Sequence, residues 1–182
     1  TLMSLELIDT ENKKLKDKAI RSIYKSMELI EKMRELENAI SSGGEAKIYN
    51  LKVIIESITK DYRDIKFNIN GNCNVIGDNA LTSVIDNIVR NAVIHGKTDR
   101  ITFDISEKGK NCILKISDYG KGIPDEIKHK IFDEGFSHGE QLSSGLGFFI
   151  VKKTIERYGG EITFEDNLPT GAVFIITLKK AE

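Results

Sequence analysis

The stretch Asn87-Ile-Val-Arg-Asn91-Ala-Val-Ile-His95 places two asparagines and a histidine at intervals of four residues. On a helix, positions i, i+4 and i+8 drift only about 80° around the axis, so the three side chains form one polar line. Leu81 and Ile85 begin an apolar arc that borders this line. The pattern therefore predicts a helix whose polar line lies at the rim of a packed layer.

Two asparagines on one helical stripe need an explanation, because the Asn amide competes with the backbone for hydrogen bonds. One interpretation is that Asn87 and Asn91 cap loops or face water. The other is that their carbonyl oxygens bind a hard cation such as Mg²⁺, which prefers oxygen donors and accompanies nucleotide phosphates.

A second motif, Asp118-Tyr-Gly120-Lys-Gly122-Ile123-Pro, directly follows a predicted strand. The two glycines allow the backbone to bend close to a flat ligand. A carboxylate at a strand end accepts hydrogen bonds from an exocyclic amine such as adenine N6, and Ile123 can lie against the ring face. Asp and Gly in a loop are also common as a simple turn, so the motif is informative only in combination with others.

A third motif, Ser144-Gly145-Leu146-Gly147, opens another predicted helix. Free backbone N–H groups and the positive end of the helix dipole converge at such a start, which suits phosphate. The motif is neither a Walker loop, which needs Gly-Lys-Ser/Thr, nor a GxGxxG dinucleotide fingerprint.

Residues 133–146 show little periodicity inside a compact domain, which predicts a lid. Phe132 and Phe136 are expected to anchor its near end in the core. The lid contains no Lys or Arg, so His138 is its one potential cation. His138 either touches a terminal phosphate or is a solvated loop residue.

Composition excludes several classes of protein. The 182 residues are 40% hydrophobic, which is enough to form a core. The net charge of −1 provides no excess of positive charge with which to bind nucleic acid or an anionic membrane. The sequence shows neither an apolar run long enough to cross a bilayer nor a leader peptide. We therefore expect a soluble, cytoplasmic segment of a protein. Because the first residue is Thr1, we expect a longer parent, which upstream segments may anchor in a membrane. Cys73 and Cys112 are expected as two buried thiols.

The predicted fold is an α/β (α+β) two-layer sandwich, in which a mixed, mainly antiparallel sheet packs on about three helices. One long amphipathic helix is expected over residues 1–44, where the Ser-Ser-Gly-Gly run ends it. A compact domain is expected over residues 45–182. Helices are expected at 51–62, 78–95, 125–132 and 146–158, and strands at 65–70, 74–76, 100–107, 112–117, 161–165 and 172–178.

The order of these motifs resembles the catalytic and ATP-binding domain of sensor histidine kinases, in the superfamily that also holds DNA gyrase and the MutL repair proteins. The resemblance spans roughly residues 48–180. The matching segments are an N box at 87–95, a first glycine box at 118–124, an F box at 131–136, a second glycine box at 145–152, and the last two strands at 158–165 and 170–174.

The resemblance implies that the loop over residues 133–146 is an ATP lid. It also implies that the protein is a histidine kinase, a transferase that moves the γ-phosphoryl group of ATP to a histidine outside this segment. It gives the catalytic and metal-binding roles to Asn91, with help from Asn87, and adenine recognition to Asp118. The implied cofactors are ATP and Mg²⁺. The residues expected to contact them are Asn87, Asn91, His95, Asp118, Gly120, Gly122, Ile123, Phe136, His138, Ser144, Gly145, Leu146 and Gly147.

The resemblance also implies partners. These are a response-regulator receiver domain, the protein's own dimerisation and phosphoacceptor helix, and a second copy of the chain that associates through residues 1–44. Nucleic acid is not expected as a partner. Residues 1–44 contain no histidine and resemble the second helix of the dimerisation hairpin. We therefore expect this segment to bind ATP but not to phosphorylate itself on histidine.

Two departures leave alternatives open. Ile94 stands where many relatives have Lys or Arg, and the lid also lacks Lys and Arg. Both departures leave open a degenerate ATP-binding regulator without kinase activity. An anti-sigma-factor type of serine kinase is less favoured. Such kinases carry Glu as a base where this chain has Asn87, and Asn cannot accept a proton.

Overall fold

The computed structural model describes residues 2–40, 44–136 and 145–181. Its contacts divide the chain into two compact units, Thr1–Arg34 and Glu35–Glu182. Each unit is described by itself.

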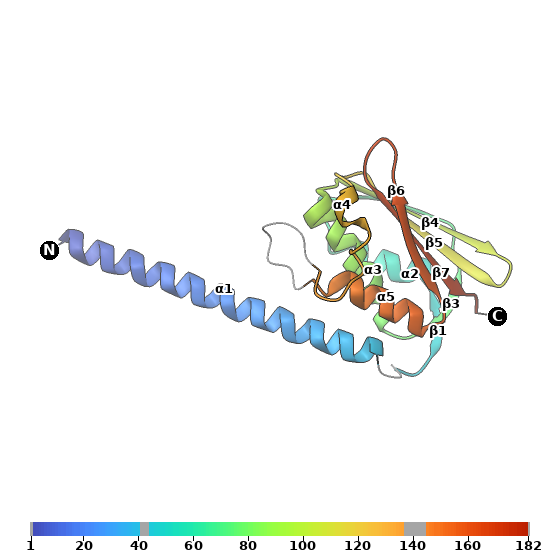
Figure 1. The fold of residues 1–182 in the computed structure, drawn as a ribbon, viewed down its shortest axis with the longest axis horizontal. Coiled ribbons are helices and arrows are strands. Elements are labelled where there is room, and N and C mark those ends of the chain that lie inside the picture. The colour runs from blue at the N-terminus through green and yellow to red at the C-terminus, as the bar shows by residue number, and fades with distance from the viewer. Residues whose placement is uncertain (1, 41–43, 137–144, 182) are drawn as a thin grey trace. The chain divides into compact units, whose positions relative to one another are not determined.

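The N-terminal part of the chain forms one long helix, α1 (Leu2–Ile40), as its heptad-like pattern predicts (Figure 1). None of the helices in the described part of the chain has the length and hydropathy needed to cross a bilayer. Several large apolar side chains of α1 are exposed, which identifies an apolar stripe: Leu15, Ile20, Ile23, Met27, Leu29, Ile30 and Met33.

The second unit alternates short strands and helices (Figure 1). Its elements are β1 (Lys47–Asn50), α2 (Leu51–Thr59), β2 (Lys66–Asn70), β3 (Asn74–Gly77), α3 (Ala80–Asn91), the π-helical turn η1 (Ala92–Gly96), β4 (Arg100–Lys108), β5 (Asn111–Asp118), α4 (Asp125–Lys128), α5 (Gly147–Arg157), β6 (Glu161–Asp166) and β7 (Ala172–Lys179).

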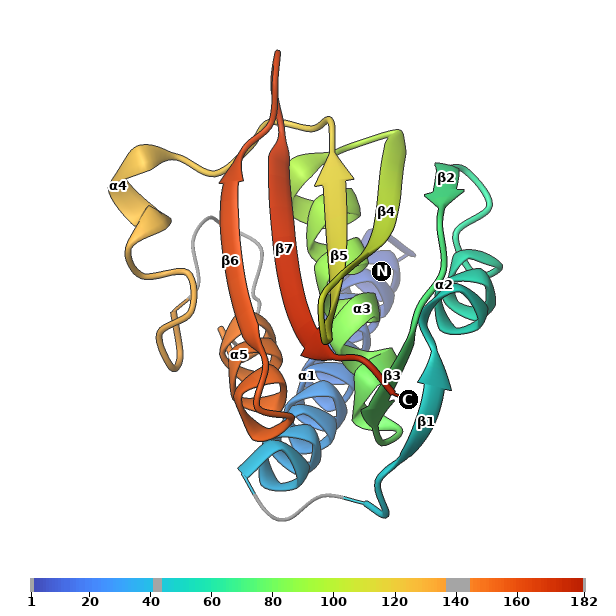
Figure 2. The ribbon, with the colours of Figure 1, turned by 90° about the vertical axis from the view of Figure 1, so that its right-hand side faces the viewer.

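A five-stranded sheet in the order β2-β4-β5-β7-β6 forms one layer. The β2–β4 pair is parallel and the other pairs are antiparallel. Helices α3 and α5 lie behind the sheet in Figure 2, and α2 packs against α3 and β2. Strands β1 and β3 form a separate antiparallel ribbon. The predicted two-layer sandwich with a mixed, mainly antiparallel sheet is confirmed.

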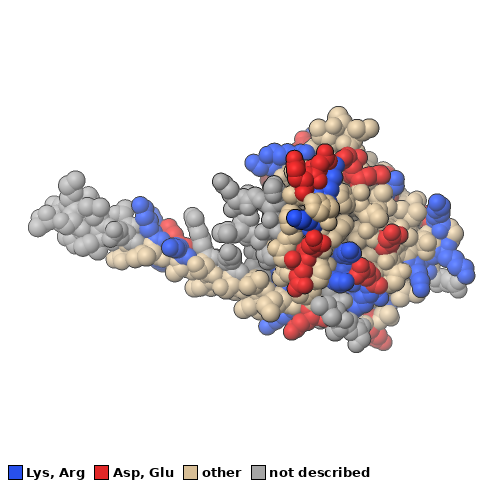
Figure 3. Space-filling view, in the orientation of Figure 1, with Lys and Arg blue, Asp and Glu red and all other residues tan. Residues whose placement is uncertain are grey.

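Alternation along the strands explains which face of the sheet is covered. On β4, Ile101, Phe103 and Ile105 are buried while the residues between them are more exposed, as expected for a strand with one face on a core. The buried face continues across the sheet, because the strand register pairs Phe103 of β4 with Ile116 of β5, and Ile116 with Phe174 of β7. Acidic and basic side chains are interspersed over the face of the second unit that Figure 3 shows.

Most predicted element boundaries agree with the structure to within a few residues. Asn50 caps α2 as expected, since its side chain accepts a hydrogen bond from the Val53 N–H at 3.1 Å. The helix expected over 125–132 is shorter than predicted and covers only Asp125–Lys128. Strand β1 was not predicted, because four residues that alternate poorly leave no periodic signal.

The expectation of two separate buried thiols is wrong for this structure, in which Cys73 and Cys112 form a disulfide. Both are buried and their Cα atoms lie 6.1 Å apart. They meet because both lie beside the end of β7: Ala181 donates a backbone hydrogen bond to the Asn74 carbonyl, and Lys180 to the Lys110 carbonyl. Their 39-residue separation in sequence gives no hint of this pairing.

Asp78 joins three parts of the second unit. Arg157 donates to its carboxylate at 2.6 Å and Tyr158 at 2.5 Å, while the backbone N–H groups of Gly44 and Ala80 donate at 3.0 and 2.9 Å. Burial by itself would raise the pKa of Asp78, but these hydrogen bonds outweigh it and lower the pKa to about 2. The junction therefore holds the start of α3 against the end of α5 and the segment at residue 44.

We expect Asp78→Asn to lower the free energy of unfolding by roughly 2 kcal/mol at neutral pH, because each pKa unit corresponds to about 1.4 kcal/mol. A depressed pKa stabilises the folded state above the unfolded pKa, near pH 4, and this stabilisation is lost as the pH falls towards about 2. Urea unfolding of both proteins across this range checks the prediction.

The exposed carboxylate Asp125, which pairs with Lys128, supplies the control Asp125→Asn. A stability difference between wild type and Asp78→Asn that stayed constant from neutral pH to about pH 2 would contradict this role of Asp78.

Candidate functional site

The first residue of α5 lies directly against the amide line of α3. A Cβ atom added to Gly147 would stand 3.3 Å from Asn87 Oδ1 and 3.7 Å from Asn91 Nδ2. A larger side chain at 147 would therefore press on both amides. Two motifs that are about 55 residues apart in sequence, the polar helix line and the second glycine box, form one surface.

The two asparagines have different environments. Asn87 is 2% exposed, its Nδ2 donates to the Ser83 carbonyl at 2.9 Å, and its Oδ1 accepts from Arg90 at 3.3 Å. Asn91 is half-buried, and no hydrogen bond to its side chain is found among the described residues. Asn91 is thus the amide available to a ligand, while Asn87 is held inside the layer beside it.

The α3 helix ends in the π-helical turn η1, after which Lys97 adopts a left-handed conformation with φ of 53°. This turn brings Gly96 to the loop that follows β5. Lys121 donates its N–H to the Gly96 carbonyl at 2.9 Å, and a Cβ on Gly120 would lie 2.3 Å from the same oxygen. His95 in this turn is exposed. The N box and the first glycine box are therefore in backbone contact.

Asp118 at the end of β5 is 5% exposed. The Gly120 N–H donates to its Oδ1 at 2.9 Å and the Ala172 N–H to its Oδ2 at 3.3 Å. Burial raises the pKa of Asp118, and the two backbone hydrogen bonds only partly offset this. A carboxylate has about four lone-pair sites, so one that already accepts these two bonds can still accept from an exocyclic amine.

The glycines of the first glycine box, which we expect to let the backbone bend close to a ligand, also allow close packing of backbone segments on one another. Gly120 is crowded by Gly96, and a Cβ on Gly122, whose φ is +73°, would lie 3.0 Å from the Gly171 carbonyl oxygen. A Cβ on Gly171 would lie 2.1 Å from the Asp118 carbonyl oxygen. These glycines allow backbone segments to pack on one another, and this packing is what places Asp118.

The F box meets the second glycine box in the same way. A Cβ on Gly145, whose φ is +68°, would lie 2.5 Å from the Gly135 carbonyl group and 2.8 Å from that of Phe136. Phe132 stands 6.0 Å from Phe148 and is anchored in the aromatic cluster that continues into the sheet. Phe136 also packs against the core. Both expected anchors are confirmed.

Of the remaining predicted residues, the structure describes Ile123 and Leu146. Ile123 is partly buried against the core, and Leu146 accepts a backbone hydrogen bond from Ile150 at the start of α5. His138 and Ser144 lie outside the described residues.

Sequence reasoning missed two residues that hold the Asp118 loop, Thr98 and Asn167. Thr98 accepts the Tyr119 N–H, and Asn167 donates to the Asp118 carbonyl. Neither lies in a recognisable motif. The one sequence signal is that Asn167 opens a turn rich in Pro and Gly.

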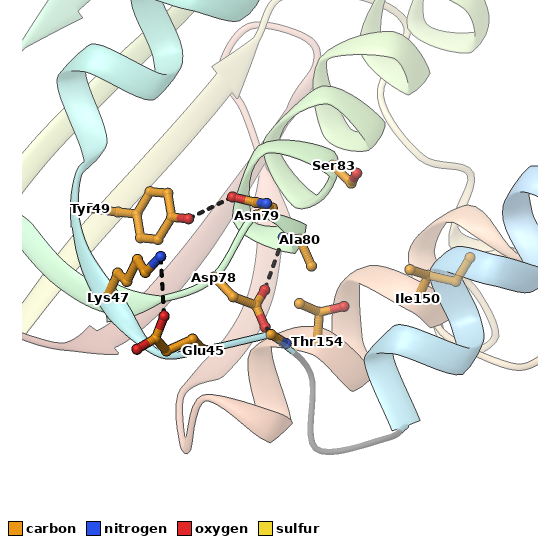
Figure 4. A pocket seen from close by; sticks show the side chains of 10 residues that line it. Glu45, Lys47, Tyr49, Asp78, Asn79, Ala80, Ser83, Ile150 and Thr154 are labelled. Atoms are coloured by element: carbon orange, nitrogen blue, oxygen red, sulfur yellow. Dashed lines mark hydrogen bonds and ion pairs between the residues drawn. The ribbon is translucent and has the colours of Figure 1, made fainter.

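A cavity of about 340 Å³ lies at the other end of α3 (Figure 4). Asp78 and Ala80 from the first turn of α3 line it together with Tyr49 and Thr154. Tyr49 donates to Asn79 at 2.7 Å on its wall. None of the predicted site residues lines this cavity, so it is separate from the site built around Asn91 and Asp118.

With this geometry in place, comparison with known proteins identifies the family. Residues 77–182 match the family described as histidine kinase-, DNA gyrase B-, and HSP90-like ATPases. This match covers more than half of the chain, and the chain belongs to that family.

Curated relatives are sensor kinases. The chain is 35% identical over 109 residues to the sensor protein CitS of Halalkalibacterium halodurans. The aligned region covers 56% of this chain and 20% of CitS. The chain is 28% identical over 197 residues to the sensor protein KdpD of Clostridium acetobutylicum, covering 96% of this chain and 21% of KdpD. The chain thus spans about a fifth of the length of these relatives.

Solved structures agree with the sequence matches. The mycobacterial sensor histidine kinase MprB is 25% identical with a TM-score of 0.66, over 75% of this chain and 98% of that chain. The catalytic domain of histidine kinase ThkA is 28% identical with the same TM-score, over 75% and 97%. The second unit therefore has the fold of histidine kinase catalytic domains, and it is an ATP-binding domain.

We expect Gly120→Ala to lower ATP affinity by at least about tenfold, because its methyl group would displace the Gly96 carbonyl and with it the loop that carries Asp118. Gly109→Ala is the control. Gly109 also has positive φ, but nothing lies within 4 Å of an added Cβ, so this variant reports backbone strain alone. Calorimetric titration with an ATP analogue measures both. Equal affinities for the two variants would contradict the packing role of Gly120.

Proposed function

We propose that this chain is the ATP-binding catalytic part of a two-component sensor histidine kinase. In this proposal it transfers the γ-phosphoryl group of ATP to a histidine outside these 182 residues. The observation that carries the proposal is the contact of Gly147 with the amides of Asn87 and Asn91. It places a helix start that suits phosphate beside the side-chain amide of Asn91, whose oxygen is the kind of ligand that suits a hard cation.

The start of α5 provides donors for phosphate oxygens. Helix α5 has eleven residues and begins at Gly147, and no side chain among the described residues caps its first N–H groups. These groups and the positive end of the helix dipole favour an anion. Gly147 has no side chain, which keeps the approach to these donors open.

The residues beside this helix start fit Mg²⁺. Among the described residues, no cluster of three or more His, Cys, Asp or Glu side chains could hold a metal ion. Asn91 offers one amide oxygen, and the phosphates of a bound nucleotide would offer others. When bound, Mg²⁺ neutralises negative charge on the transferring phosphate.

Asp118 recognises the base in this proposal. Its carboxylate is buried and its orientation is fixed by the N–H groups of Gly120 and Ala172. It accepts the N6 amino protons of adenine, as the sequence motif predicts, while the chain positions the nucleotide and provides no nucleophile. Phosphoryl transfer depends mainly on such positioning and on charge neutralisation.

The position of Asn87 argues for a histidine acceptor over a hydroxyl or water. Asn87 is buried and its amide cannot accept a proton, so it cannot activate a hydroxyl group. A neutral imidazole needs no proton removed before it attacks phosphorus. In this proposal the acceptor lies outside these 182 residues: residues 1–44 contain no histidine, and His95, His129 and His138 all belong to the ATP-binding domain.

The partners in this proposal are those of two-component signalling. A second copy of the chain would associate through the exposed apolar stripe of α1, and a receiver domain would take the phosphoryl group from the histidine. The names of the relatives, which are sensor proteins and sensor histidine kinases, support this assignment.

A degenerate ATP-binding regulator is the second candidate. Its support is Ile94, which is 43% exposed in the turn after α3, where a cationic side chain would otherwise reach phosphate. Acid-labile phosphate formed on a longer form of the polypeptide that carries a helix with His-Glu or His-Asp would exclude this candidate. Acid-labile phosphate on the 182-residue chain alone would contradict the external position of the acceptor.

We expect Mg²⁺ to strengthen binding of an ATP analogue to the wild-type chain, and Asn91→Ala to remove most of that gain, about tenfold in affinity. Calorimetric titrations with and without Mg²⁺ measure the effect. Asn68→Ala, on the exposed side of β2, is the control and should keep the Mg²⁺ dependence. If Asn91→Ala retained the full dependence, the assignment of Asn91 as the metal ligand would be wrong.

A further inference from the structure

Both polar groups of one peptide unit, between Asp118 and Tyr119, are held by side chains from distant parts of the chain. The Asn167 Nδ2 group donates to the Asp118 carbonyl oxygen at 2.7 Å. The Thr98 hydroxyl oxygen accepts the Tyr119 N–H at 3.2 Å. Side chains rarely hold both sides of a loop peptide, since most buried peptide groups bond to other backbone groups.

Asn167 is itself fixed in orientation. It follows β6, and its Oδ1 accepts the Leu168 N–H at 2.9 Å, which leaves the Nδ2 group to donate to Asp118. Its backbone N–H donates to the Gly171 carbonyl at 3.0 Å, so the turn between β6 and β7 is closed. The Asn167 amide therefore acts as a rigid donor towards Asp118.

Thr98 holds the other side of the peptide. It is 5% exposed and lies between η1 and β4. Its hydroxyl donates to the Arg100 carbonyl at 2.7 Å, and its oxygen accepts the N–H groups of Arg100 and Tyr119. Its backbone N–H bonds to the Ala92 carbonyl, which connects it to the end of the N box.

The two contacts restrict the Asp118 carboxylate. A flip of the Asp118–Tyr119 peptide would change the direction of the chain at Asp118 and break both side-chain contacts at once. With the peptide held, the bonds of the carboxylate to Gly120 and Ala172 leave it one orientation. Neither Thr98 nor Asn167 belongs to the glycine or amide motifs of the site.

We propose that Thr98 and Asn167 are positioning residues that hold the Asp118–Tyr119 peptide from opposite sides and so set the preference of the site for a purine with an exocyclic amine. This inference rests on the proposed function, in which Asp118 accepts from that amine. The positioning acts on one hydrogen bond to the base and leaves the phosphate contacts at α5 unchanged.

The test compares ATP with inosine triphosphate, which carries a carbonyl oxygen in place of the amine. Thr98→Val removes the hydroxyl at nearly constant volume, and Asn167→Ala removes the amide. Each variant should weaken ATP binding about fivefold, the effect of one neutral hydrogen bond, and leave inosine triphosphate binding unchanged. Thr98→Ser keeps the hydroxyl and should keep the wild-type ratio of the two affinities.

Asn70→Ala is the matched control. The Asn70 amide also donates a 2.8 Å hydrogen bond, to Asp104, but on the outer part of the sheet. The variants are titrated in the presence of Mg²⁺, and their thermal unfolding is recorded. Because both side chains act on one peptide, the double variant Thr98→Val/Asn167→Ala should lose less ATP affinity than the product of the two single effects.

The proposal is overturned if both single variants keep the wild-type ratio of ATP to inosine triphosphate affinity, including the case in which both nucleotides weaken equally. If Thr98→Val does not fold, Asn167→Ala decides, since Asn167 lies in a half-exposed turn. A wild-type chain that binds ATP but does not prefer it would refute base recognition by Asp118 itself. A wild-type chain that binds neither nucleotide would refute the proposed function.

Discussion

The contact between the start of α5 and the amides of α3 is the constraint on which the rest of the site depends. A Cβ atom at position 147 would be tight against Asn87 Oδ1, at 3.3 Å, and would touch Asn91 Nδ2 at 3.7 Å. The distant ends of the same two helices are joined by Arg157 and Tyr158 of the α5 terminus, which bond to Asp78. The helices are therefore in contact at both ends, and the contacts at Asp78 help to keep the start of α5 against the amide line of α3.

Backbone packing has a comparable role around Asp118. Gly120, Gly122 and Gly171 are each crowded by another backbone segment, so three loops lie closer together than side chains would permit. Their contacts place the Asp118 carboxylate where backbone N–H groups of two loops hold it. A buried carboxylate that is satisfied in this way is rigid, which is what recognition of one particular base requires.

Features with a local physical cause could be predicted from sequence. The 3.6-residue periodicity located α3, and the second glycine motif located the start of α5. The order of the four motifs was sufficient to indicate the family, and the family match over residues 77–182 confirms it.

Features that depend on contacts between distant segments could not be predicted. Thr98 and Asn167 have ordinary local sequences, and only the fold brings them to the same peptide. The pairing of Cys73 with Cys112 likewise depends on where β7 ends. The role of the first-glycine-box glycines in backbone packing became visible only from the atoms around them.

Hydrogen–deuterium exchange of the chain, with and without a non-hydrolysable ATP analogue and Mg²⁺, tests most directly whether these segments form one nucleotide site. The account predicts that the nucleotide slows exchange together at residues 87–96, 118–123 and 145–150, while the outer strands β2 and β6 are unchanged. Slower exchange at only one of the three segments, or at none of them, would contradict it.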